Sequence, residues 1–450
     1  MVAWYGPGGR RSLPRVRDAE IAVVGAGPAG CAAAITLARG GRRVVLLDRA
    51  HVPRDKCCGD GLTSGALRRL RRLGLETAAV SSWTEIAEVL VRSPSGRVCR
   101  FPFPSGPGPA AAVARRVDLD AALVQLARAE GVTVLEGHRV TGMDGGDDGL
   151  TLRVEGGDNV GAPFVIAADG MWSPLRKAMG LVGEAGYFGE WHAFRQYWRA
   201  PGQAVNQMWV WFEPELLPGY AWSFPVGGGL ANVGFGVLRR TGAGEARGRA
   251  SSSHEGRRWR PRNEQHPARR DRWPTGQDVS RLRETVLERP HVRQVLGTGA
   301  EPDEAPRTWP IPARLSTTAL AGAGGRVLFA GDAARAPDPM TGEGIAQALE
   351  TGELAARAVL TAGPAHPAAA ASSYRRSVHS GLVVDDRLAR LLAVALRFPV
   401  SARGAVRLAG STPWVSRQFA RWLFEDYPRA YLATPWRWQR GALVEPGSFH

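Results

Sequence analysis

The segment that most constrains the fold is residues 21–30, I-A-V-V-G-A-G-P-A-G. Its four apolar residues predict a buried strand, and Gly25, Gly27 and Gly30 follow at the spacing of a dinucleotide-binding loop. The small apolar residues 31–39 then predict a helix. In such a loop the first glycine permits a tight turn and the second lets the backbone approach a pyrophosphate. The third lets helix and strand pack closely.

A second predicted strand, at 44–47, supports this interpretation because it ends in Asp48, where an acid that binds ribose is expected. An acid rather than a basic residue at this position argues against the 2′-phosphate of NADP and leaves FAD or NAD. Arg49, next to it, is also a candidate cofactor contact. Pro28 and Ala29 open the helix, whose N-terminus favours the phosphate charge. We therefore predict that these residues hold the ADP half of a dinucleotide.

A net charge of +16 suggests a nucleic-acid partner, but the distribution of that charge argues against one. Residues 239–272 hold eleven arginines against four acidic residues, without hydrophobic periodicity. We interpret 239–277 as a disordered insertion. Only Lys56 and Lys177 are lysines, and the excess of Arg, Ala, Gly and Pro is typical of high-GC coding bias. We expect no nucleic-acid partner.

The four cysteines, Cys31, Cys57, Cys58 and Cys99, have no spacing typical of disulfides or of a metal site, which fits a reducing cytoplasm. The first residues lack the apolar core of a signal peptide. No apolar run approaches the roughly 18 residues of a membrane-spanning helix. We expect a cytoplasmic protein without a metal, either soluble or peripheral to a membrane.

Two later segments point to a flavin. Residues 164–168 predict a strand that ends at Asp169, and Gly170 adds a flexible turn. Residues 331–345, G-D-A-A-R-A-P-D-P-M-T-G-E-G-I, are more specific. There Asp332 follows a predicted buried strand and can accept a hydrogen bond from a ribityl hydroxyl.

The rest of this second segment also suits a flat ring. Gly331, Pro339 and Gly342 shape a loop that the ring can approach. Gly344 and Ile345 open a helix whose positive end can stabilise an anionic reduced flavin. An ordinary helix-entry loop is the alternative, but the order of the three motifs favours FAD.

That order resembles the para-hydroxybenzoate-hydroxylase-like flavoproteins over about residues 20–365. The resemblance implies an arginine before a helix of the FAD-binding domain, for which Arg116 is the best match and Arg115 lies beside it. No second G-x-G-x-x-G motif is present for a nicotinamide cofactor. The resemblance implies that none is required, because NAD(P)H visits such flavoproteins transiently.

Two segments narrow the resemblance to the geranylgeranyl reductase family, which includes bacterial menaquinone reductases. P-R-D-K-C-C-G-D-G-L at 53–62 resembles its K-x-C-G-(D/G)-G-L element, and P-G-Y-A-W-S-F-P at 218–225 resembles its Y-x-W-x-F-P element. The resemblance implies an α/β fold: a Rossmann-type FAD-binding domain, an inserted antiparallel-sheet substrate domain and a helical C-terminal region.

Within that fold we predict a hairpin turn at 94–96 and helices at 117–130 and 278–296. The predicted units are an irregular leader 1–17, FAD-binding parts 18–82, 113–185 and 306–370, substrate-domain parts 83–112 and 186–305, and the C-terminal region 371–450.

The predicted substrate contacts are Tyr220, Trp222 and Phe224, which alternate along a strand that Pro225 ends. They wall an apolar channel beside the flavin or, in the alternative, are ordinary core aromatics. We assign catalytic roles to Tyr220, Trp222 and Cys58.

Cys58 lies in a glycine-bounded loop with Gly59, near the expected ring, and is either a functional thiol or a small apolar filler. Asp60 is expected to be a polar contact in that loop, and Lys56 a solvated charge. Cys57 stands where the family usually has another residue type, so it is the weaker candidate.

The C-terminal region mixes arginines with aromatic side chains, which suits either a membrane interface or a helical lid. The aromatics are Trp414, Trp422, Phe424, Tyr427, Tyr431, Trp436 and Trp438. We expect a protein peripheral to the inner face of the cell membrane.

The implied activity is FAD-dependent saturation of double bonds in a prenyl lipid, with proton delivery by Cys58 or by an ordered water. NAD(P)H, or alternatively ferredoxin, is the expected donor. An aromatic monooxygenase or halogenase is the main alternative, although the lysine essential to halogenases lacks a convincing counterpart here. A non-catalytic prenyl-lipid binder is another.

Overall fold

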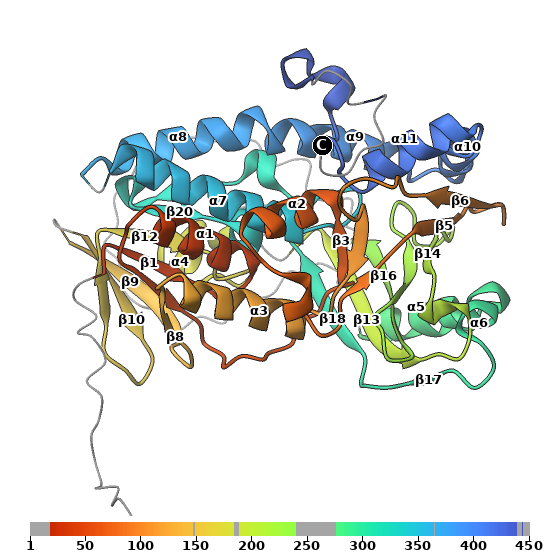
Figure 1. The fold of residues 1–450 in the computed structure, drawn as a ribbon, viewed down its shortest axis with the longest axis horizontal. Helices are drawn as coiled ribbons and strands as arrows, with labels where there is room; N and C mark the ends of the chain where they lie inside the picture. The colour runs from red at the N-terminus through yellow and green to blue at the C-terminus, as the bar shows by residue number, and fades with distance from the viewer. Residues whose placement is uncertain are drawn as a thin grey trace, which may run out of the picture.

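The computed structural model describes residues 19–146, 149–183, 189–239, 276–363, 365–438 and 443 (Figure 1). The predicted leader, and the predicted insertion apart from residues 239, 276 and 277, lie outside the described residues. Within them the helices are α1 (Pro28–Arg39), α2 (Ser64–Arg72), α3 (Arg116–Ala129), α4 (Pro174–Ala178), α5 (Gly276–Leu287), α6 (Pro290–Leu296), α7 (Ile345–Ala362), α8 (Pro367–Ser380), α9 (Leu382–Ala395), α10 (Pro399–Ala409) and α11 (Pro413–Leu423).

A mainly parallel sheet forms the first layer of the described part. Its order is β19 (Ala321–Gly322), β20 (Val327–Phe329), β12 (Phe164–Ala167), β1 (Ile21–Val24), β2 (Val44–Leu47) and β8 (Thr133–Leu135), with only β19 antiparallel. The strands are continuous apolar runs because both faces are covered. Helices α1 and α7 pack together so closely that a Cβ at Gly352 would lie 2.1 Å from the carbonyl oxygen of Ala29.

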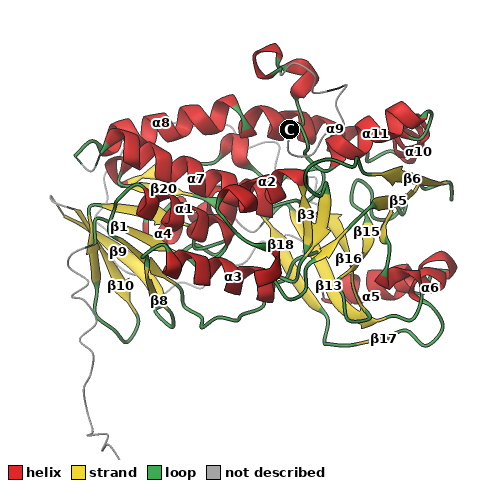
Figure 2. Ribbon diagram, viewed as in Figure 1, coloured by secondary structure: helices red, strands yellow, loops and turns green. Residues whose placement is uncertain are grey.

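A larger, mostly antiparallel sheet lies beside this layer (Figure 2). Its order is β17 (Glu301–Pro302), β13 (Trp191–Arg199), β16 (Leu230–Leu238), β15 (Ala221–Pro225), β14 (Met208–Trp211), β5 (Glu88–Arg92) and β6 (Val98–Pro102), and β18 (Arg307–Ile311) also pairs with β13. The β5–β6 hairpin joins through parallel pairing of β5 with β14. Its predicted turn at 94–96 is confirmed, and Gly96 supplies the left-handed φ of +89°.

Two small sheets complete the strands of the described part. One runs β11 (Val160–Ala162), β10 (Gly149–Val154) and β9 (Val140–Gly146); the other runs β3 (Gly61–Thr63), β7 (Ala111–Val113) and β4 (Thr84–Glu85). The α/β architecture with antiparallel sheets and a helical C-terminal region confirms the predicted fold class.

The predicted helix at 117–130 is confirmed as α3, but the single helix predicted at 278–296 is wrong. Two helices, α5 and α6, replace it. Pro290 cannot donate the backbone hydrogen bond that a helix interior needs, so it stands at the start of α6. Arg289 before it adopts extended angles (φ −62°, ψ 134°), as a residue before proline prefers.

Helices α8, α9, α11 and α10 follow one edge of the molecule, drawn in blue in Figure 1. Phe419 of α11 packs on Phe101 of β6 with ring centroids 4.9 Å apart, and Phe424 packs on Phe103 at 4.5 Å. Of the predicted interfacial aromatics, Trp422, Phe424, Tyr427 and Tyr431 pack inward, whereas Trp414, Trp436 and Trp438 are exposed. Among the described residues, no helix is both long and apolar enough to cross a bilayer.

Candidate active site

A cavity of about 980 Å³ lies between the carboxyl ends of the parallel strands and the large sheet. It gathers most of the predicted site residues from segments far apart in the chain. Those that line it are Gly25, Gly27, Pro28, Ala29, Asp48, Arg49, Cys58, Gly59, Arg116, Asp169, Tyr220, Trp222, Phe224, Gly331, Asp332, Gly342, Gly344 and Ile345.

Three predicted residues do not line this cavity. Gly30 packs inside the first βα turn, and Pro225 ends β15 beyond the cavity wall. Pro339 lines a smaller, separate cavity of about 110 Å³, because the loop turns its neighbours Met340 and Thr341 toward the main one.

The glycine loop has the geometry that its spacing predicts. Gly25 has φ +101°, and a Cβ there would lie 2.3 Å from the carbonyl oxygen of Ala168. A Cβ at Gly30 would lie 1.8 Å from the carbonyl oxygen of Gly25, so only glycine lets helix and strand meet. Gly27 has more space than Gly25 and Gly30, because the nearest atoms to a Cβ built there, two arginine nitrogens, lie 3.8 and 3.9 Å away. The free space there faces the cavity.

Two arginine guanidinium groups lie beside Gly27, each paired with a carboxylate. The nearest atoms to the Cβ position of Gly27 are Nη2 of Arg54 and Nη2 of Arg116, at 3.8 and 3.9 Å. Asp120 holds the Arg116 guanidinium in a fork (Nε–Oδ1 2.8 Å, Nη2–Oδ2 2.7 Å) and accepts from Arg54 at 3.0 Å. Asp48 accepts the amide of Ala26 at 2.7 Å. These groups suit a bound pyrophosphate and ribose.

Asp169 lines this cavity and has one carboxylate oxygen without a partner in the described part of the chain. Its Oδ2 accepts from Ser173 Oγ at 2.8 Å and from the Leu175 amide at 3.3 Å. Its Oδ1 is buried without a hydrogen-bond partner among the described residues. Burial raises the pKa of Asp169 to about 6. An unpartnered buried acceptor beside a cavity lined by glycine backbone fits a site for a ligand with hydroxyl groups, as FAD has.

Lys56 is not the solvated charge that the sequence predicts. Its Nζ lies 2.7 Å from Oδ2 of Asp332, and both side chains line the cavity. The carboxylate draws the long lysine side chain inward because the two segments meet across the cavity. Lys177 also lines it. Both lysines of the chain therefore face the site.

The aromatic strand meets the cysteine loop directly. Tyr220, Trp222 and Phe224 lie on one face, with successive ring centroids 6.0 and 6.1 Å apart. A Cβ at Gly59 would lie 3.6 Å from ring atoms of both Trp222 and Phe224. The polar cradle and this aromatic wall therefore belong to one cavity. Trp191, Trp309, Ile311 and Met340 extend its apolar lining.

Behind Cys58 lies a buried network centred on Asp60, which is fully buried and has φ +65°. Its Oδ2 accepts from Tyr197 Oη at 2.6 Å and from Asn232 Nδ2 at 2.7 Å. Asn232 Nδ2 also donates to the carbonyl oxygen of Cys58 at 2.9 Å, and Asn232 Oδ1 accepts from Trp222 Nε1 at 3.0 Å. One amide thus connects the cysteine loop with the aromatic wall.

Charge and burial at this network favour a protonated thiol. The amide of Asp60 donates to Cys58 Sγ at 3.4 Å. Burial first, and the Asp60 charge second, raise the pKa of Cys58. Burial also raises the pKa of Asp60 to about 6, against the hydrogen bonds from Tyr197 and Asn232. The sequence assigns no role to Tyr197 or Asn232. Asn232 alone lies near a motif, in the segment G-G-G-L-A-N-V that follows residues 218–225.

Glu343 is a second site residue without a predicted role, although it stands within the 331–345 segment. Its Oε1 accepts from the amides of Ile345 and Ala346, both at 2.9 Å, so it caps the start of α7. Burial, and then the charge of Glu425, raise its pKa. It lines the cavity where the predicted helix N-terminus begins.

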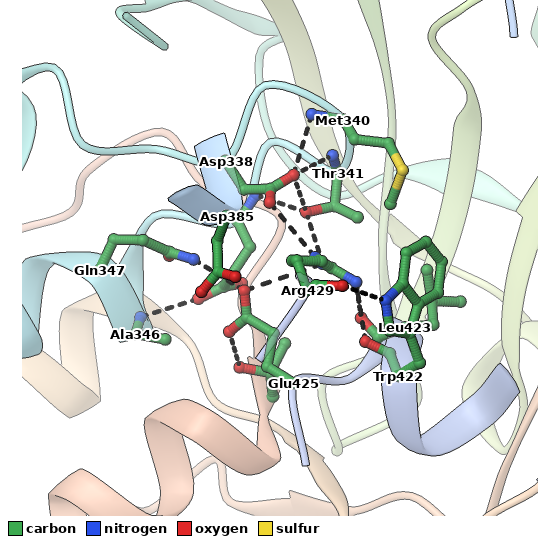
Figure 3. Close-up of polar contacts among 12 residues, drawn as sticks. Asp338, Met340, Thr341, Ala346, Gln347, Asp385, Trp422, Leu423, Glu425 and Arg429 are labelled. Atoms are coloured by element: carbon green, nitrogen blue, oxygen red, sulfur yellow. Dashed lines mark hydrogen bonds and ion pairs between the residues drawn. The ribbon is translucent and has the colours of Figure 1, made fainter. Parts of the chain in front are cut away.

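The C-terminal segment clamps this loop from behind (Figure 3). Arg429 Nε lies 3.3 Å from Oδ2 of Asp338, and both side chains are buried. Glu425 accepts from Thr63 Oγ1 at 2.9 Å and from Gln347 Nε2 at 2.7 Å. The other Asp338 and Arg429 contacts in Figure 3 involve Met340, Thr341, Trp422 and Leu423. These contacts join the C-terminal helical region, a candidate lid, to the 338–347 segment.

The fold and this cavity define a flavoprotein of the Rossmann type. Residues 18–358 match the family model described as FAD binding domain. The chain is 32% identical to the menaquinone reductase of Mycolicibacterium smegmatis, over 92% of this chain and 97% of that protein. It is 30% identical to digeranylgeranylglycerophospholipid reductase 2 of Methanopyrus kandleri, over 75% of each chain.

A solved structure, of a geranylgeranyl bacteriochlorophyll reductase-like protein from Thermoplasma acidophilum, shares the fold. The TM-score is 0.70 at 17% identity, covering 90% of this chain and 96% of the other. The chain belongs to the FAD-binding-domain family and, within it, to the geranylgeranyl reductase group that includes menaquinone reductases. It is an FAD-dependent oxidoreductase.

Proposed function

We propose that this enzyme saturates a double bond in the prenyl chain of a membrane lipid, with menaquinone as the first candidate. One observation carries the proposal: the glycine loop, the Gly59 loop and the aromatic side chains of Trp222 and Phe224 line one cavity, and a Cβ built on Gly59 would lie 3.6 Å from both rings. The likeness to menaquinone reductase over nearly the whole chain supports the choice of lipid.

FAD bound in the cradle supplies a hydride when reduced. Gly27, Arg54 and Arg116 would hold its pyrophosphate, and Asp169 would accept a hydrogen bond from one of its hydroxyl groups. Trp222 and Phe224 hold the prenyl chain by van der Waals contact, which selects the double bond that reacts. The apolar lining excludes water and strengthens the electrostatic interactions inside.

Cys58 holds the proton that an isolated alkene needs in this proposal. Its thiol stays protonated because burial and Asp60 oppose its ionisation. The S–H bond breaks as the proton joins one alkene carbon, hydride joins the other, and the thiolate recovers a proton from water. An ordered water is the alternative donor.

We further propose that NAD(P)H reduces the flavin by a transient visit, with ferredoxin as the alternative donor. The substrate lies in the bilayer, so the enzyme works at the inner face of the cell membrane. The C-terminal aromatics Trp414, Trp436 and Trp438 support this location because they are exposed.

The chemical identity of the reaction product tests this proposal. Reduced, anaerobic holoenzyme is incubated separately with menaquinone and with geranylgeranyl diphosphate, and mass spectrometry follows the added hydrogen atoms. We expect one or more pairs of added hydrogens in the prenyl chain of at least one substrate. Hydroxylated or halogenated aromatic product, formed only with oxygen, would support the monooxygenase or halogenase alternative. Binding without turnover would support a lipid carrier.

The role of Cys58 is tested by Cys58→Ala, with Cys57→Ser as a neighbouring control. A general acid contributes typically about 100- to 10,000-fold, so Cys58→Ala should slow chain reduction by that factor while leaving flavin reduction unchanged. The Cys57 thiol points toward the carbonyl oxygen of Arg307, at 4.0 Å, and its variant should stay active. If Cys58→Ala reduces the prenyl chain at a rate within about threefold of wild type, the proton comes from water instead.

A further inference from the structure

The exposed large apolar side chains of this protein are concentrated in one part of the chain. Of twelve such side chains among the described residues, nine lie between 391 and 438. Leu391 is 69% exposed, Phe398 62% and Val400 76%. Surfaces of this kind mark contact with a protein or a membrane.

Five of these side chains lie on three consecutive helices, and a sixth, Phe398, lies between the first two. On α9, Leu391 and Val394 follow Arg387 along one face, and Phe398 continues that face just beyond the helix. On α10 the inward positions are Ala402, Val406 and Ala409, which leaves Val400 and Leu408 outward; Trp414 opens the outer face of α11. We call residues 387–417 of these helices the outer helical face.

The charge on this face has a single sign. Arg387, Arg397, Arg403, Arg407 and Arg417 are exposed on it. No aspartate or glutamate occurs from residue 387 to residue 424. Elsewhere exposed arginines such as Arg100 and Arg153 pair with carboxylates. Arginines without acidic neighbours, interleaved with Leu, Phe and Trp, are typical of a helix lying in the headgroup region of a bilayer.

We propose that the outer helical face docks on anionic phospholipid. Its apolar side chains enter the headgroup and acyl boundary while its arginines meet lipid phosphates. A second copy of the chain fits this surface less well, because in a symmetric dimer the five arginines of one face would lie against the five of the other and repel them. This inference deepens the proposed function by naming the surface that contacts the membrane. It does not depend on the reaction, since binding is measured on lipid without quinone.

Vesicle flotation tests the proposal with FAD-loaded full-length protein and no substrate. Wild type should bind vesicles of equal phosphatidylglycerol and phosphatidylcholine, bind pure phosphatidylcholine weakly, and dissociate at high salt. The triple variant Arg403→Gln, Arg407→Gln, Arg417→Gln should weaken binding about 100-fold, from roughly fivefold per arginine. The control, Arg128→Gln, Arg153→Gln, Arg199→Gln, removes the same charge outside this face and outside the cavity and should bind as wild type.

The apolar half of the face is tested by Phe398→Ser with Leu408→Ser. This variant should bind anionic vesicles about tenfold more weakly but reduce detergent-solubilised substrate at the wild-type rate. Equal binding by wild type and the arginine variant, or no preference for anionic vesicles, would overturn the proposal. So would a wild-type dimer that Phe398→Ser dissociates while vesicles stay unbound. Loss of turnover with intact vesicle binding would instead count against the proposed function alone.

Discussion

Asp60→Asn is the substitution that most directly probes the buried network behind Cys58. The side chain keeps its shape and can still accept a hydrogen bond from Tyr197 or Asn232. It loses its ability to ionise. Because Asp60 is fully buried, its charge is not spread into solvent, so the effect of ionisation on folding should be large.

The magnitude follows from the pKa of Asp60, which burial raises from 3.8 to about 6. A difference of about two pKa units corresponds to about 3 kcal/mol. The folded state holds this proton more tightly than the unfolded state does. The stabilisation is therefore complete below pH 3.8 and is lost as the pH rises through 6. The variant lacks this loss, so its stability relative to wild type should rise by about 3 kcal/mol between pH 4 and pH 7.

Urea unfolding of FAD-saturated protein at several pH values measures this difference. The control is Asp158→Asn, which makes the same substitution at an exposed position outside the network. Alkylation of Cys58 gives a second readout: its thiol should react faster in Asp60→Asn above pH 6, because the charge that opposes thiolate formation is gone. A pH-independent difference between Asp60→Asn and wild type would refute the assignment of a buried, titrating Asp60.

Two further substitutions test the cradle and its clamp. Gly30→Ala should abolish flavin binding, measured by the absorbance of bound FAD, because its Cβ would lie 1.8 Å from the carbonyl oxygen of Gly25. Gly145→Ala, which meets no atom within 4 Å, should bind FAD normally. Arg429→Met should lower the unfolding free energy by about 3 to 5 kcal/mol, measured with urea, since Asp338 would lose its buried cation. Full FAD binding by Gly30→Ala, or an Arg429→Met change below about 1 kcal/mol, would contradict these readings.

The fold was predictable where local chemistry and tertiary packing agree. The buried strand, glycine loop and helix at 21–39 are set by residues close in sequence, and so is the Gly96 turn. The helix predicted from hydrophobic periodicity at 278–296 is wrong because Pro290, which has no backbone N–H, interrupts it and begins a second helix.

The candidate site was predictable for residues inside motifs and not for their distant partners. Tyr197 and Asn232 lie far from Asp60 in the chain and meet it only when β13 and β16 pair. Lys56 looked solvated because nothing in its own segment indicated Asp332, which approaches from another element. Such contacts depend on tertiary topology, which residue spacing does not encode.

The central claim is that electrons pass from the flavin to a prenyl double bond held against the aromatic wall. Anaerobic stopped-flow reoxidation of the reduced holoenzyme tests it with two quinones that differ only in the tail, menaquinone and its fully saturated analogue. If the prenyl double bond accepts the electrons, menaquinone should reoxidise the reduced enzyme rapidly and the saturated analogue should hardly reoxidise it. Equal rates would show that the quinone ring accepts the electrons, and would contradict the central claim.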